Sequence, residues 1–75
     1  MIVEAIVGKV FNVDPENVTD GSSKDTIAEW DSMGHLSLIT GLEEHFKVSF
    51  SIADAMEMTS VGKIKTILKG YGIST

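Results

Sequence analysis

The sequence of 75 residues contains no cysteine. Neither a disulfide framework nor a thiolate metal site can therefore support the fold, although chains of this length often depend on one or the other. The two histidines, His35 and His45, lie far apart in the chain and lack the clustered spacing of metal ligands. We expect an apolar core alone to hold the fold together, and we expect no metal site.

Arginine is also absent, and the formal net charge is −5. All 11 acidic residues lie at or before Glu57, whereas the segment from Val61 onward carries lysines and no acid. Nucleic acids and anionic membranes demand basic contacts, so this charge argues against both as partners. An acidic body favours basic protein partners; the alternative is that its charge only keeps the protein soluble.

Long hydrophobic runs are missing as well. No run approaches the roughly 20 apolar residues that a membrane-spanning helix needs, and the start, Met1-Ile2-Val3-Glu4, has no basic region of a secretion signal. Apolar residues still make up 43% of the chain, which is enough to fold. We expect a cytoplasmic monomer without membrane insertion, folded as a single domain over residues 1–75.

Apolar spacing predicts four helices joined by turn-rich sequence. In the first of them, Val3, Val7 and Phe11 recur at helical intervals, although the β-branched residues also suit a strand and Gly8 weakens a helix. Gly70 is expected to stop the last helix. The predicted helices run from Ile2 to about Phe11, from Ser32 to Phe46, from Ile52 to Glu57 and from Val61 to about Lys69.

A long connection, residues 12–31, precedes the clearest of these helices. Asp14-Pro15-Glu16 is typical of a cap, a proline at the first helical position and a first-turn acid, and predicts one short turn. Spaced apolar residues are expected to pin this loop to the core: Val13, Val18, Ile27 and Trp30. The sequence thus predicts an all-α bundle of three main helices and one short helix, with a long first loop.

The predicted helix 32–46 has two different faces. One face places Leu38, Leu42 and Phe46 toward the core, with His35 at its edge as a packing or hydrogen-bonding residue. The roughly opposite face carries Met33, Leu36, Thr40 and Glu44. A partly apolar exposed stripe is unusual without a partner, so this face is predicted to bind one; a solvated face with scattered apolar residues is the alternative.

Asp31 and Ser32 stand where the long loop enters this helix. Read locally, Asp31 is an N-cap and Ser32 a first-turn residue, which is what most such pairs are. A helix N-terminus also favours an attached anion, because its N–H groups are unpaired and carry partial positive charge. The exposed serine is within reach of a modifying enzyme, so both interpretations stay open from the residues alone.

An ordered set of motifs resembles the acyl carrier proteins. Asp31-Ser32-Met33 is similar to their Asp-Ser-Leu signature, and the later motifs follow in an ungapped register along nearly the whole chain. Each motif alone is weak, whereas the ordered set is specific. The other matching runs are Val13-Asp14-Pro15-Glu16-Asn17-Val18, Leu42-Glu43-Glu44-His45-Phe46 and Met58-Thr59-Ser60-Val61.

This resemblance implies a four-helix carrier that is not itself an enzyme. A phosphopantetheinyl transferase, using Mg²⁺, would move 4′-phosphopantetheine from coenzyme A onto Ser32, and the arm would carry cargo as a thioester to acyl-loading and acyl-transferring enzymes. Trp30 would contact the core, the arm or a partner. In this family an acyl chain can enter between the helices, and Met56 and Met58 would adapt to one or simply fill a dry core. The implied partner surface comprises Asp31, Met33, Leu36, Thr40, Glu43, Glu44, Ile52 and Met56.

Departures from the family pattern bear on the pathway. Carriers of fatty acid biosynthesis usually have acids where this chain has Gly34, Ser37 and His45. Gly34 is also expected to weaken the first helical turn by about 1 kcal/mol relative to alanine. The Trp30-Asp31-Ser32 junction resembles stand-alone carriers of specialised lipid, polyketide-like or surface-polysaccharide pathways. The alternatives are an aminoacyl carrier of the D-alanyl type, which Asp-Ser-Met-Gly resembles, and an unmodified helical interaction module.

Overall fold

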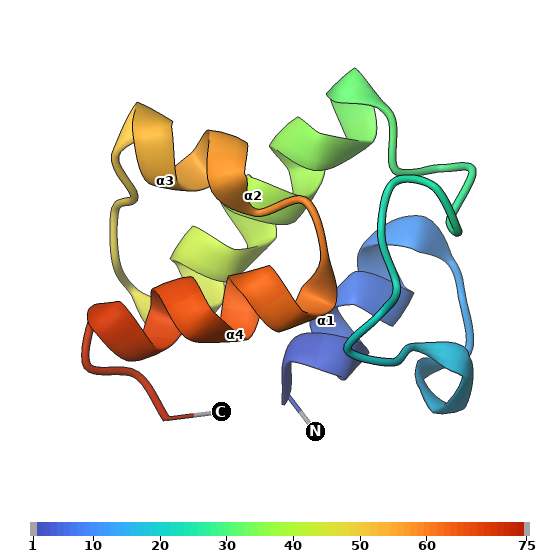
Figure 1. Cartoon of the computed structure of the whole chain (residues 1–75), viewed down its shortest axis with the longest axis horizontal. Coiled ribbons are helices and arrows are strands. Elements are labelled where there is room, and N and C mark those ends of the chain that lie inside the picture. The colour runs from blue at the N-terminus through green and yellow to red at the C-terminus, as the bar shows by residue number, and fades with distance from the viewer. Residues whose placement is uncertain (1, 75) are drawn as a thin grey trace.

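The computed structural model describes residues 2–74. It is an all-α bundle, as predicted, and over these residues it contains no strand, only one isolated antiparallel bridge between Ser23 and Ser60. Helix α1 packs against α2 and α4, and α3 lies against α4 (Figure 1). The elements are α1 (Ile2–Phe11), the short 3-10 turn η1 (Pro15–Asn17), α2 (Ser32–Phe46), α3 (Ile52–Glu57) and α4 (Val61–Gly70).

Three of the helices begin at a polar side chain that caps the first turn. The side-chain oxygens of Asp31, Ser51 and Ser60 each accept a hydrogen bond from the backbone N–H three residues later, at 2.8, 3.1 and 3.2 Å. Such a cap satisfies one of the unpaired N–H groups of the first turn and contributes about 1 kcal/mol. The predicted starts of α2, α3 and α4 are therefore confirmed.

The ends of the helices are marked less clearly in the sequence than their starts. Gly70 was predicted to follow the end of α4 as the glycine that terminates it, and this was wrong. Gly70 is the last residue of the helix, and the glycine with left-handed backbone is Gly72, with φ of 81°. The backbone also turns left-handed at Asn12 and Lys47, which end α1 and α2 with φ of 57° and 55°. Neither residue carries a signal as strong as glycine for this conformation.

Position 8, inside α1, requires glycine because the chain after the helix folds back onto this turn. The N–H of Val13 donates to the Gly8 carbonyl oxygen at 2.9 Å, and a Cβ at Gly8 would lie 2.5 Å from the Val13 carbonyl oxygen. The helix thus loses some intrinsic propensity at Gly8, and the close return of the loop requires it.

The core lies where α1, α2 and α4 meet, and the long loop contributes to it. Of the predicted loop anchors, Val18, Ile27 and Trp30 are buried and Val13 is partly buried. Ile39, Phe46 and Phe50 pack at the margin of the core. The remaining buried apolar residues are Val3, Val7, Phe11, Leu38, Leu42, Met58, Val61, Ile64 and Leu68.

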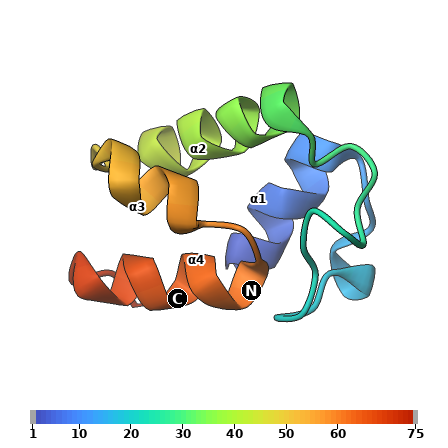
Figure 2. The same cartoon turned by 45° about the horizontal axis from the view of Figure 1, so that its top comes forward.

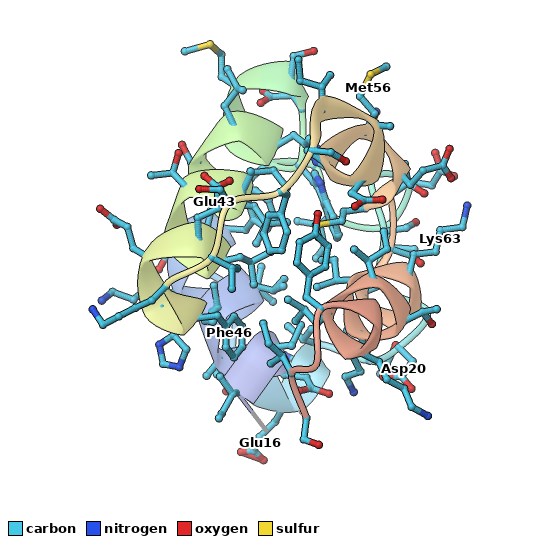
Figure 3. All side chains as sticks on the ribbon, turned by 90° about the vertical axis from the view of Figure 1, so that its left-hand side faces the viewer. Glu16, Asp20, Glu43, Phe46, Met56 and Lys63 are labelled. Atoms are coloured by element: carbon cyan, nitrogen blue, oxygen red, sulfur yellow. The ribbon has the colours of Figure 1, made fainter. Side chains whose placement is uncertain are left out.

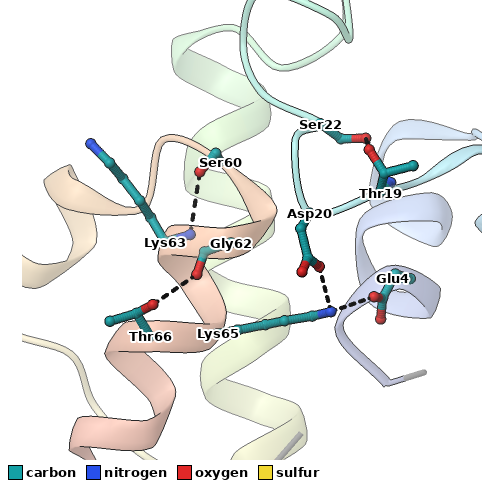
Figure 4. Close-up of polar contacts among 9 residues, drawn as sticks. All are labelled: Glu4, Thr19, Asp20, Ser22, Ser60, Gly62, Lys63, Lys65 and Thr66. Atoms are coloured by element: carbon teal, nitrogen blue, oxygen red, sulfur yellow. Dashed lines mark hydrogen bonds and ion pairs between the residues drawn. The ribbon is translucent and has the colours of Figure 1, made fainter.

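The loop is also joined to the start of α4 by polar contacts. The N–H groups of Val61 and Gly62 donate to the carbonyl oxygens of Ser22 and Asp20, each at 2.9 Å. On the next turn of α4, the Lys65 ammonium lies 2.6 Å from carboxylate oxygens of both Glu4 and Asp20 (Figure 4). The loop is therefore ordered before it reaches α2.

Candidate functional site

Ser32 is the first residue of α2 and is exposed. It lies two residues after Trp30, which is buried and stacks on Phe11 with ring centroids 5.3 Å apart. This confirms the prediction that Trp30 anchors the loop to the core. A serine held at the surface so close to a buried anchor has a fixed position, even though a long loop delivers it (Figure 1).

The first turn of α2 suits a phosphodiester on the Ser32 oxygen. The Asp31 carboxylate accepts the N–H of Gly34 at 2.8 Å, and the Asp31 carbonyl oxygen accepts the N–H of His35 at 2.7 Å. The N–H groups of Ser32 and Met33 have no acceptor among residues 2–74. A helix N-terminus with free N–H groups stabilises a bound anion, so the residues present fit this group.

Gly34 is required by the way in which the loop lies on α2. A Cβ at this position would overlap the carbonyl oxygen of Glu29 and would lie 2.9 Å from Cε1 of Phe11. The expected loss of helix propensity at Gly34 is thus accompanied by a packing requirement that the sequence did not reveal. Any side chain there would force the loop or the first turn of α2 to shift, so packing disfavours an acid at this position.

His35 lies at the edge of the core, as predicted, and forms two hydrogen bonds. The indole N–H of Trp30 donates to Nδ1 of His35 at 3.0 Å, and Nε2 of His35 lies 2.7 Å from the carbonyl oxygen of Ala55. The rings of Trp30 and His35 are stacked at 6.4 Å. These contacts join the end of the loop, α2 and α3 at the site.

Four large apolar side chains are exposed on α2 and α3. Met33 and Leu36 on α2 are 74% and 63% exposed, and Ile52 and Met56 on α3 are 81% and 70% exposed. Figure 3 shows Met56 pointing away from the bundle. Asp31, which caps α2, is exposed beside them. The structure thus leaves all of these predicted partner residues accessible.

The other predicted partner residues differ in exposure and in the surface that they face. Thr40 is exposed on α2. Glu44 lines an open groove between α1 and α2, together with Ile6 and Val10. Glu43 is partly buried, and its carboxylate accepts the backbone N–H of Phe50 at 2.8 Å. Glu43 therefore fixes the loop after α2, and its role in the structure is not limited to the surface.

Two polar contacts of α3 could not be predicted from the local sequence pattern. One is the acceptor of His35, a backbone carbonyl that any residue at position 55 would supply. The other is Tyr71, whose hydroxyl donates to the Asp54 carboxylate at 2.6 Å. A tyrosine after the last helix is a weak hint of such a contact, because a buried phenol usually finds a partner.

The geometry defines a helical bundle that displays one serine at a helix start beside an apolar surface. The sequence matches the family model for the phosphopantetheine attachment site over residues 2–68, so the chain belongs to this family. Its cofactor is 4′-phosphopantetheine, and the protein is a carrier of the acyl carrier protein type, a class that is generally non-catalytic.

Solved structures show the same fold. A protein of Mycobacterium tuberculosis designated an acyl carrier protein superimposes with a TM-score of 0.81 at 24% identity, over 93% of each chain. The holo acyl carrier protein of Geobacter metallireducens superimposes with a TM-score of 0.74 at 26% identity, over 99% of this chain and 91% of that one. A search of curated proteins gave no match.

Residues 2–74 show neither a membrane-spanning helix nor a cluster of metal ligands. No described helix combines the length and apolar character needed to cross a membrane. Within the same range, histidine and carboxylate side chains form no cluster of three that would hold a metal ion.

Proposed function

We propose that Ser32 is the residue that carries the 4′-phosphopantetheine arm. The transferase would join the Ser32 oxygen to the phosphorus of 4′-phosphopantetheine, while the pyrophosphate bond of coenzyme A breaks, adenosine 3′,5′-bisphosphate leaves and the serine proton is lost. The observation that carries the proposal is an exposed Ser32 at the start of α2, two residues after a buried tryptophan. There the enzyme reaches the hydroxyl freely, and the helix terminus stabilises the phosphate.

The arm would present its cargo to enzymes that dock on α2 and α3. The exposed side chains of Met33, Leu36, Ile52 and Met56 support this surface, since exposed apolar side chains close to a reactive group favour association. Asp31, with Thr40, Glu43 and Glu44 further along α2, supplies its polar and acidic part. The net charge of −5 would steer basic partner surfaces toward it.

The carrier would serve a specialised pathway for acyl or related intermediates, and not general fatty acid synthesis. The support is chemical: α2 offers Gly34 and Ser37 at positions where acids would recruit the basic docking surfaces of fatty acid synthase enzymes. At Gly34 the acid is disfavoured by the Glu29 carbonyl oxygen. A partner of this chain would therefore rely more on the apolar side chains than on ion pairs along α2.

The attachment site is tested by loading the protein with coenzyme A and a phosphopantetheinyl transferase of broad specificity. Intact-mass measurement should show one added arm on the wild-type protein and none on Ser32→Ala. Ser37→Ala, an exposed serine on the same helix, is the matched control and should be modified like the wild type. Each variant should retain a helical circular dichroism spectrum.

Two outcomes would reject the proposal. A wild-type protein that stays unmodified after complete incubation would favour an unmodified interaction module, in which Asp31 and Ser32 only begin a helix. An arm that still attaches to Ser32→Ala would place the modification on another residue. Peptide mapping of the modified protein would then identify that residue.

A further inference from the structure

A chain of hydrogen bonds crosses the seam between α2 and α3, one turn beyond Ser32. The indole of Trp30 can only donate to Nδ1 of His35, and the Ala55 carbonyl oxygen can only accept from Nε2. The imidazole is therefore neutral, with its proton on Nε2. Ala55 lies in the last turn of α3, where its carbonyl oxygen also accepts the N–H of Met58 at 3.3 Å, so His35 is the shorter of its two partners.

This hydrogen bond links two helices whose backbones do not pack closely against each other. Over the described residues, the close helix pairs are α1 with α2, α1 with α4 and α3 with α4, and α2 with α3 is not among them. Figure 2 shows α3 beside α2, above α4. Helix α3 has no buried residue of its own. The imidazole of His35 thus provides a direct polar link between α2 and α3, one turn along α2 from Ser32.

An apolar chain tethered to Ser32 would gain free energy by moving from water into the core. His35 lies three residues after Ser32, or about 4.5 Å along the helix axis. The contact of His35 with α3 is therefore the first link between α2 and α3 that such a chain would meet, and Leu38 and Met58, which follow on α2 and after α3, are buried in the core. To enter, the chain would have to separate His35 from Ala55, so Nε2 of His35 would lose its acceptor and the Ala55 carbonyl oxygen would keep only the longer bond from the Met58 N–H, at 3.3 Å.

We propose that the His35–Ala55 hydrogen bond closes the interior of this carrier, so that a cargo on Ser32 stays outside the bundle. This inference rests on the proposed attachment of the arm to Ser32. Cargo held outside is exposed to water, which suits short or polar acyl groups. A longer apolar group would lie on the exposed side chains of Met33, Leu36 and Met56.

The test compares a short and a long cargo on the same protein. Wild type, His35→Ala and His45→Ala are loaded by a transferase with coenzyme A analogues that bear an acetyl or an octanoyl group through a stable amide. Thermal unfolding is then measured for each form. His45 is exposed near the end of α2 and serves as the matched control.

The expected result is a selective effect of His35. Acetyl and octanoyl forms of wild type and of His45→Ala should unfold at the same temperature within about 1 °C. In His35→Ala the octanoyl form should unfold roughly 4–8 °C above the acetyl form, because about 1 kcal/mol of new burial shifts the midpoint of a small domain by that much. A role of His35 in stability alone would lower both forms equally.

A second measurement needs no variant. With a ¹³C-labelled octanoyl group on the wild-type protein, nuclear Overhauser contacts to Met33, Leu36 or Met56 are expected. Contacts to the methyl groups of Leu38 or Met58 would overturn the inference, even if His35→Ala failed to fold. The nitrogen spectrum of His35 should also report the neutral form with its proton on Nε2.

The remaining outcomes separate the two proposals. Equal octanoyl stabilisation of wild type and His35→Ala, or none in either, would show that His35 does not close the interior, while attachment to Ser32 would stand. A mass spectrum without any arm would overturn the attachment proposal and this inference with it.

Discussion

Gly34 lies in the first turn of α2, against the backbone of the loop that delivers Ser32. Alanine has the higher intrinsic helix propensity, by about 1 kcal/mol. A methyl group at this position would nevertheless overlap the Glu29 carbonyl oxygen and crowd the Phe11 ring. Overpacking against backbone costs typically 1–3 kcal/mol. We predict that Gly34→Ala lowers the free energy of unfolding by about 1–2 kcal/mol in urea titrations.

Gly70 provides the matched control for this prediction. It is the last residue of α4, and a Cβ there would meet no atom within 4 Å. Gly70→Ala should therefore raise the free energy of unfolding, by up to about 1 kcal/mol. If both alanine variants shifted stability in the same direction, packing at Gly34 would not be the reason for its glycine.

Helix α3 is held in place through its two ends. It has only 6 residues, too few for an isolated helix to be stable, and none of them is buried. At its end His35 bonds to Ala55. At its start the Tyr71 hydroxyl donates to the Asp54 carboxylate at 2.6 Å and accepts the N–H of Ser51 at 3.2 Å.

Tyr71→Phe tests the contact at the start of α3. The ring packs edge-on against Phe50, with centroids 5.2 Å apart, and this contact is retained in phenylalanine. Loss of the charge-assisted hydrogen bond should lower the free energy of unfolding by about 1–2 kcal/mol. Amide hydrogen exchange should accelerate mainly in α3, because a short helix without buried residues opens before the rest of the bundle.

A double-mutant cycle with Asp54→Ala isolates the pair. If Tyr71 and Asp54 stabilise each other, Tyr71→Phe should cost markedly less in the Asp54→Ala background than in wild type. Equal costs in both backgrounds would show that the hydroxyl acts elsewhere, for example through Ser51.

The starts of the helices were predictable because their causes are local. Asp31, Ser51 and Ser60 each cap a turn that begins at the next residue, and apolar spacing places the helices behind them. The ends were less predictable. Lys47 and Asn12 adopt left-handed backbone without being glycine, and Gly72 takes the role that was assigned to Gly70.

The position of Ser32 at a helix start was also predictable, since it follows a local cap. The side-chain contacts that hold α3 in place near it were not predictable. His35 and Ala55 are 20 residues apart in the sequence, and Asp54 and Tyr71 are 17 apart. No local pattern reports contacts at these separations. The packing that disfavours a side chain at Gly34 likewise depends on Phe11 and on the path of the loop.

At the scale of the whole molecule, one ion cluster joins α1, the long loop and α4. The Lys65 ammonium lies 2.6 Å from both Glu4 and Asp20 (Figure 4). The Asp20 side chain is 70% exposed, so water screens its contribution. Glu4 is only 12% exposed, and its second oxygen is buried without a hydrogen-bond partner among the described residues. Glu4 therefore depends on Lys65 more than Asp20 does.

The pKa values of this cluster set the pH range in which it stabilises the fold. Burial is the largest single influence and raises the pKa of the Glu4 carboxyl, but the hydrogen bond from Lys65, a backbone hydrogen bond and the nearby positive charge together outweigh it, so the net pKa lies below the ordinary 4.5. Hydrogen bonds to Asp20 and Glu4 raise the pKa of Lys65 above 10.5. The Glu4 contribution is thus present above pH 4.5 and is lost as the pH falls through the lower native pKa. That of Lys65 is present below pH 10.5 and is lost at higher pH.

Glu4→Gln should show this dependence in urea unfolding between pH 7 and pH 3. At pH 7 the wild type should be more stable than the variant by about 1–2 kcal/mol, because a partly buried charged hydrogen bond is lost. The difference should stay constant to about pH 5 and shrink below pH 4.5, as the native carboxylate is protonated. In a Lys65→Met background the hydrogen bond and charge of Lys65 no longer offset the burial of Glu4, so the same substitution should become neutral or stabilising at pH 7. A difference that persisted unchanged to pH 3, or that survived the loss of Lys65, would show that α1 and α4 are held together by packing and not by this ion pair.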